Sequence, residues 1–107
     1  MIAFDLVYLP IFMDSLAEIV DYFESELFFS EAQITTFVTN IDKKVQILKF
    51  QPAHHQDIAE RFGFSEKTYR INIGKYYSLL YRVNETEQKV YIGRVFSQRQ
   101  MKIDFGD

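Results

Sequence analysis

The spacing of the apolar residues changes once along this chain, from the period of a helix to the period of a strand. In residues 11–28 and 31–50, apolar side chains recur three and four positions apart, as they do on one face of an amphipathic helix. From residue 68 onward, apolar and polar side chains alternate, which is typical of strands with one buried face. The pattern therefore predicts two helices followed by a sheet.

Short local signals mark the ends of these elements. Residues 2–9 are rich in β-branched and aromatic side chains and stop at Pro10, which predicts a short first strand. Ser30, followed three positions later by Gln33, is typical of a capping box that begins the second helix, and Pro52 ends that helix. Because the break between the two helices is so short, we expect them to form an antiparallel hairpin.

The second half of the chain is expected to form a meander of three strands, which cover residues 68–73, 76–83 and 89–96. A tight turn at Gly74 and Lys75 joins the first two, and residues 101–105 are expected to add a short edge strand. Residues 53–66 are expected to be a loop containing at most a helical turn. The predicted fold class is α+β in the order β-α-α-β-β-β(-β), with the helical hairpin packed on one face of a small antiparallel sheet and the other face free.

The alternation also assigns side chains to the two faces of the sheet. Three tyrosines lie in phase with aliphatic residues and are expected in the core: Tyr69, Tyr77 and Tyr81. Three residues of the last strand are expected to face the same way: Val90, Ile92 and Phe96. Tyr76 and Tyr91 have the opposite phase, so they are expected to be available for stacking on a base or on a side chain of a partner.

Composition narrows the class of protein further. At 107 residues the chain can fill one core, so residues 1–107 are expected to form a single domain. The sequence has no cysteine, which excludes disulfides, thiolate catalysis and cysteine-ligated zinc. It shows no signal peptide and no apolar run long enough to span a bilayer, so we expect a cytoplasmic protein without a membrane partner.

Charge is distributed unevenly along the chain. Residues 1–66 carry 11 acidic and 4 basic side chains, whereas residues 67–107 carry 4 acidic and 8 basic ones, although the formal net charge is only -3. Such a split indicates either a basic face on the predicted sheet or ordinary solvated cations spread over three strands.

The second half of the chain resembles the toxins of the RelE/ParE superfamily, which belong to type II toxin–antitoxin systems. The resemblance lies in YRINIGKYYSLLYRV, a polar turn and VYIGRVFSQRQ, in this order. The matching positions are Tyr69, Arg70, Tyr77, Leu79, Tyr81, Arg94, Val95 and Arg99. Residues 17–23 and 41–52 resemble the helices of the same family, so nearly the whole chain is covered. The resemblance implies a cognate antitoxin protein as partner. It also implies one of two targets: DNA gyrase, as in ParE-type toxins, or mRNA on the ribosome, as in RelE-type toxins.

Cleavage of RNA by its own 2′-hydroxyl needs a base, an acid and cations that stabilise the phosphoryl oxygens. Compared with the RelE pattern, three expected groups are replaced, by Asn72, Ser78 and Ser97, and no tyrosine follows Tyr91. Arg70 and Arg99 remain as cations, but an arginine does not act as a base. His54 or His55, in the loop before the second strand, can supply a base near neutral pH, unless both are solvent-exposed spacers. The candidate catalytic residues are Arg70, Arg99, His54 and His55.

Our main hypothesis is a ParE-like toxin that acts by binding DNA gyrase. The alternatives are a RelE-like ribosome-dependent mRNA endoribonuclease with a divergent site, and an inactive binding or regulatory module. A chain that is net acidic favours the first and third over an enzyme that docks on the ribosome. The candidate residues for binding the target or the antitoxin are Arg70, Tyr76, Arg82, Tyr91, Arg94 and Arg99. We expect no metal, because the two adjacent histidines lack a third ligand at suitable spacing, and no cofactor or small-molecule substrate.

Overall fold

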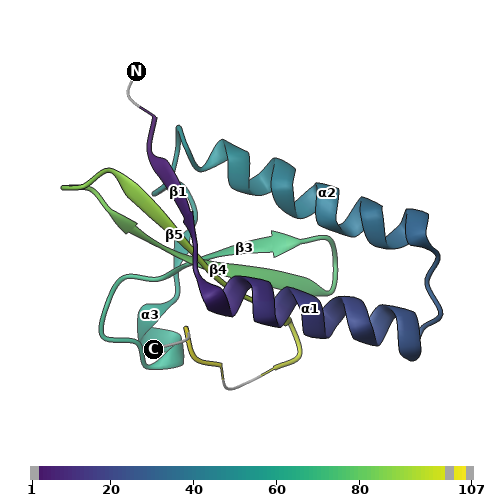
Figure 1. The fold of residues 1–107 in the computed structure, drawn as a ribbon. Coiled ribbons are helices and arrows are strands. Elements are labelled where there is room, and N and C mark those ends of the chain that lie inside the picture. Colours follow the sequence, from purple (N-terminus) through teal and green to yellow (C-terminus); the bar gives the residue numbers. More distant parts are fainter. Residues whose placement is uncertain (1–2, 101–102, 106–107) are drawn as a thin grey trace.

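The computed structural model describes residues 3–100 and 103–105 and has the predicted α+β architecture (Figure 1). Its elements are β1 (Asp5–Tyr8), α1 (Pro10–Ser25), α2 (Glu31–Ile47), β2 (Gln56–Asp57), α3 (Ala59–Phe62), β3 (Tyr69–Ile73), β4 (Tyr77–Asn84) and β5 (Lys89–Ser97). The five strands form one sheet in the order β1-β5-β4-β3-β2. None of the helices in the described part of the chain is long and apolar enough to cross a membrane.

The sheet is mixed, whereas a wholly antiparallel sheet was expected. Strands β3, β4 and β5 form the predicted antiparallel meander, but β1 pairs with β5 in parallel, with Val7 opposite Tyr91. Two parallel neighbouring strands need a long connection between them. The helical hairpin forms the first part of the connection from β1 to β5. The first strand thus joins the last one, at the edge of the sheet away from β2.

The helical hairpin covers one face of the sheet, as predicted. Helices α1 and α2 run in opposite directions in Figure 1, and they pack mainly on β5 and β3, respectively. The capping box at the start of α2 is confirmed, because the Gln33 amide N–H donates to Ser30 Oγ at 3.1 Å and the Ser30 amide N–H donates to Gln33 Oε1 at 2.7 Å. The core beneath the helices contains the aliphatic stripes of both helices and the in-phase residues of the sheet, including Ile41, Val45, Ile71, Leu79 and Tyr81.

The opposite face of the sheet is not free, which corrects the sequence-based expectation. The segment 53–66, expected as a loop with a helical turn, contains α3 as that turn and also the short strand β2, and α3 packs on this face. The segment 103–105 lies on the same face and is not a strand, while residues 101–102 of the expected edge strand lie outside the described residues. Together they build a second apolar cluster, made of Ile58, Leu80, Phe96 and Phe105 with the partly buried Leu9, Phe62, Phe64 and Ile103.

A β-bulge in β5 explains why the predicted position of Phe96 is wrong. Leu79 pairs with Val95 and Tyr81 pairs with Ile92, so β5 has one more residue than β4 between these two pairs. One extra residue reverses the side-chain phase of the rest of the strand. Val95 therefore joins the core under the helices, and Phe96 joins the second cluster.

Candidate functional site

Arg82 is part of the interior of the protein, although it is a cation on the sheet. Its side chain is buried, its Nε donates to Thr68 Oγ1 at 3.0 Å, and its Nη1 donates to Glu66 Oε2 at 3.1 Å. The guanidinium also lies 3.9 Å from the centre of the Phe105 ring. These contacts satisfy a buried charge and hold the C-terminal segment against the sheet.

Two further cations of the basic half form ion pairs with nearby acids. Arg94 donates from Nε to the Asp104 carbonyl oxygen at 3.0 Å and from Nη2 to Asp104 Oδ1 at 2.9 Å. Lys89 Nζ lies 3.4 Å from Glu87 Oε2. Three cations of the basic half are therefore paired, with Glu66, Glu87 and Asp104. The count of charges along the sequence does not show this pairing.

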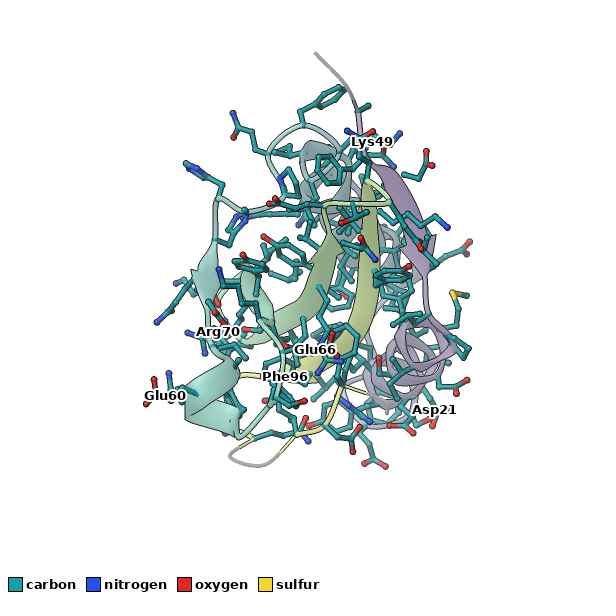
Figure 2. The ribbon with its side chains drawn as sticks, turned by 90° about the vertical axis from the view of Figure 1, so that its left-hand side faces the viewer. Asp21, Lys49, Glu60, Glu66, Arg70 and Phe96 are labelled. Atoms are coloured by element: carbon teal, nitrogen blue, oxygen red, sulfur yellow. The ribbon has the colours of Figure 1, made fainter. Side chains whose placement is uncertain are left out.

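Arg70 lies on the face of the sheet that α3 covers. Its Cα partners are Gln56 on β2 and Leu80 on β4, and Leu80 belongs to the second cluster. Figure 2 shows Arg70 above α3, whose Glu60 points outward. The side chain is half-buried, and within the described residues it forms no ion pair.

His55 contacts the other face of the sheet, the face that the helices cover. Its Nδ1 is 3.1 Å from the hydroxyl oxygen of Tyr81, which is fully buried and stacks on Tyr69 in the core under the helices. Burial lowers the pKa of His55, and the charges of His54 and Lys44 lower it further. Burial also raises the pKa of Tyr81, which keeps its hydroxyl protonated. His54 is exposed, as a spacer would be, but His55 is anchored.

The pKa shift of His55 gives a testable pH dependence. Below pH about 6.5 the unfolded chain binds a proton on this histidine more readily than the folded chain does, so stability is full above that pH and falls as the pH drops toward the folded pKa. We expect His55→Gln to reduce this fall in urea melts at pH 7.5 and pH 5.5, and His54→Gln to leave it unchanged. If the stability of the wild type rises as the pH drops from 7.5 to 5.5, and His55→Gln removes this rise, the assignment is wrong.

Arg99 and Tyr76 lie at the end of the sheet, at a groove of about 680 Å³ between the helical hairpin and the β3–β4 turn. The groove has an aromatic floor, in which Phe23 contacts Phe29, Phe37 and Tyr77 with ring centres 4.9 to 5.5 Å apart. Its rim includes Glu18 and Tyr22 from α1, Lys75 and Tyr76 from the turn, and Arg99 and Gln100 after β5. The turn itself is formed as predicted, with Gly74 at φ 63°.

Tyr91 faces away from the helices, as its phase predicted. It lies opposite Arg82 in the sheet and lines a smaller cavity of about 430 Å³ together with Glu66, Leu9 and Phe105. The described residues contain no group of three or more histidine, cysteine, aspartate or glutamate side chains that could hold a metal ion.

The candidate residues therefore occupy three separate places. Arg70 is beside α3, His55 is under the helices, and Arg99 is at the groove. Sequence reasoning did not identify the groove, because its walls come from α1, the hairpin loop, the β3–β4 turn and the segment after β5. A signal was available in the run Leu27–Phe28–Phe29, an apolar triplet at a helix break where polar residues are usual.

The fold, a helical hairpin on a small sheet that ends in a meander, is also found in a solved structure. The structure is similar to that of the archaeal RelE–RelB complex from Pyrococcus horikoshii OT3, with a TM-score of 0.57 and 14% identity over 92% of this chain and 98% of that chain. At this identity the likeness shows the fold alone. The family model described as the ParE toxin of the type II toxin–antitoxin system, parDE, matches residues 6–102, so the chain belongs to this family of toxins. No curated protein matches the chain.

Proposed function

We propose that this toxin acts by binding DNA gyrase and that a cognate antitoxin neutralises it. The observation that supports binding over RNA cleavage is the separation of the candidate catalytic groups. A nuclease needs its base and its phosphate-binding cation within hydrogen-bond reach of one scissile linkage. Here His55 and Arg70 lie on opposite faces of the sheet, and Arg99 lies at the groove.

The electrostatics support the same choice. Arg82, Lys89 and Arg94 are held in ion pairs inside the chain, and the formal net charge is -3. Ribosome docking and RNA binding depend on many cations that are free to displace counterions from phosphates. A protein target requires fewer of them, because aromatic and apolar contacts supply much of the affinity. The exposed Tyr76 fits such a contact, as do Lys75 and Arg99, neither of which forms an ion pair within the described residues.

Induced expression with two readouts tests this function. We expect filamentation and DNA-damage signalling in cells, and inhibition of supercoiling by purified gyrase. In a translating extract we expect no new cleavage sites in mRNA. Rapid mRNA cleavage on the ribosome would refute the gyrase proposal, and its loss in His54→Gln/His55→Gln would then identify the base. Toxicity without either effect would point to a different target.

The same assay tests the residues that we propose for the target. Arg99→Ala and Arg70→Ala each remove a cation that forms no ion pair within the described residues, so we expect each to weaken gyrase inhibition by about tenfold. Lys43→Ala, which removes an exposed cation of α2, is the control. If both arginine variants inhibit gyrase like the wild type, the assignment is wrong even if gyrase is the target.

A further inference from the structure

One glutamine joins the segment after β5 to the β3–β4 turn. The Gln98 amide N–H donates to the Tyr76 carbonyl oxygen at 2.8 Å, and Gln98 Nε2 donates to the Tyr77 carbonyl oxygen at 2.8 Å. The next residue, Arg99, donates its amide N–H to Ser97 Oγ at 3.3 Å. Because these bonds lie on both sides of the peptide that links Gln98 to Arg99, they fix the backbone of Arg99 relative to Tyr76.

Gln98 contributes little to the core of the protein. Its side chain is exposed, and neither apolar cluster contains it. An exposed hydrogen bond adds little to stability, because water replaces it when it breaks. A glutamine also loses rotamer freedom when its side chain is held in one conformation. The larger effect of the two Gln98 bonds is therefore on the position of the neighbouring residues.

The residues that Gln98 holds near one another have the side chains of a binding surface. Tyr76 is 66% exposed, and Lys75 and Arg99 are exposed as well. Within the part of the chain that the structure describes, neither Lys75 nor Arg99 forms an ion pair. All three residues line the same end of the groove. One ring between two cations fits a protein surface that presents carboxylates beside an apolar side chain.

The two cations belong to separate segments, so their spacing depends on what joins these segments. The last paired residues of β4 and β5 at this end are Tyr77 and Ser97. Beyond this pair, among the described residues, the hydrogen bonds between the β3–β4 turn and the segment after β5 come from Gln98. A surface whose spacing is fixed before a partner arrives loses less conformational entropy when it binds.

We propose that Gln98 is a positioning residue of the target-binding surface and holds Arg99 in place beside Lys75 and Tyr76. This role rests on the proposed function and adds the residue that prepares the surface for its target. Gln98 acts through its neighbours, since its Nε2 donates to the backbone of the toxin itself. The matching surface of the target presents carboxylates to the two cations and an apolar side chain to the Tyr76 ring.

Inhibition of supercoiling by purified gyrase tests the role of Gln98. We expect Gln98→Met, which keeps a long side chain but has no donor, to weaken inhibition about fivefold, because the surface is then ordered only on binding. Gln98→Glu places an acceptor against the Tyr77 carbonyl oxygen and should weaken inhibition at least as much. The control is Gln51→Met, the same change at an exposed glutamine outside the groove, which should stay within about twofold of the wild type.

A double-mutant cycle distinguishes positioning from a general loss of structure. If Gln98 acts through Arg99, Gln98→Met should change inhibition by less than about twofold in the Arg99→Ala background. A loss of equal size in both backgrounds would overturn the positioning role.

Two measurements on the free toxin complete the test. The NMR order parameter of the Arg99 amide should fall in Gln98→Met, because the segment is no longer held to the Tyr77 carbonyl oxygen. The melting temperature should stay within about 4 °C of the wild type, since the lost bond is exposed. An unchanged order parameter would overturn the proposal, and so would a larger fall in melting temperature combined with equal losses of inhibition in the two backgrounds.

Growth arrest on induced expression separates this role from the choice of gyrase as target. If gyrase is inhibited but both Gln98 variants inhibit it like the wild type, only the positioning role fails. If the wild type arrests growth without inhibiting gyrase, the gyrase proposal fails and growth arrest becomes the measure. Weaker arrest by Gln98→Met than by Gln51→Met then supports the positioning role, and equal arrest overturns it. If the wild type has neither effect, both proposals fail.

Discussion

Replacing Phe105 by alanine is expected to lower the free energy of unfolding by about 3–5 kcal/mol, as for other buried phenylalanines. Its ring is only 3% exposed and belongs to the cluster of Ile58, Leu80 and Phe96. It also packs on the guanidinium of Arg82 at 3.9 Å, so its removal exposes a buried charge as well as apolar surface. Urea denaturation followed by circular dichroism measures the change.

Gly93 provides a second way to disturb the same contact. A Cβ built at Gly93 would lie 2.7 and 2.8 Å from two ring carbons of Phe105 and 3.2 Å from the Leu80 carbonyl oxygen. We expect Gly93→Ala to destabilise the protein by about 1–3 kcal/mol because the ring must move. In the Phe105→Ala background the added methyl group should cost much less. Equal costs in the two backgrounds would show that the Phe105 ring does not occupy the space above Gly93.

Arg82→Ala is expected to cost about 2–3 kcal/mol, although Arg82 is a charged residue on a sheet. The substitution removes the hydrogen bond to Thr68 Oγ1 and the packing on Phe105. The ion pair with Glu66 adds less, because the Glu66 side chain is 67% exposed and water screens the interaction. The same denaturation experiment measures this loss.

Two comparison variants identify what Arg82 contributes. We expect Arg82→Met to retain more stability than Arg82→Ala, since methionine keeps apolar contact with the Phe105 ring. Glu66→Gln should lower stability by less than about 1 kcal/mol. If Glu66→Gln proves as damaging as Arg82→Ala, the ion pair and not the packing is the main contribution of Arg82.

The local elements of this protein follow from the sequence because their signals lie within a few residues. The helical period predicted both helices, and the spacing of Ser30 and Gln33 predicted the start of α2. The alternation predicted the faces of β3 and β4, including the burial of Tyr81, and also the exposure of Tyr76 just before β4. Each of these signals depends only on the geometry of one helix or one strand.

The candidate site was harder to predict, because the role of a charged residue depends on its neighbours in space. Arg82 and Arg94 have the same residue type and nearly the same strand context as Arg70 in the sequence. Only the folded chain brings Glu66 to Arg82 and Asp104 to Arg94, and so separates structural cations from available ones. The same holds for His55, whose environment is set by Tyr81 from a distant strand.

The sequence by itself determined that the chain forms two amphipathic helices and then a meander with one buried face. Its motifs indicated the toxin family that the family model then showed. The tertiary structure decided that β1 pairs in parallel with β5, that a bulge turns Phe96 to the second face, and that α3 and the segment 103–105 cover that face. It also decided that Arg82, Lys89 and Arg94 are held in ion pairs, whereas Arg70 and Arg99 form none within the described residues. The physical reason is that periodicity is a property of a single element. Strand register, bulges and ion pairs between distant residues form only when the elements pack together.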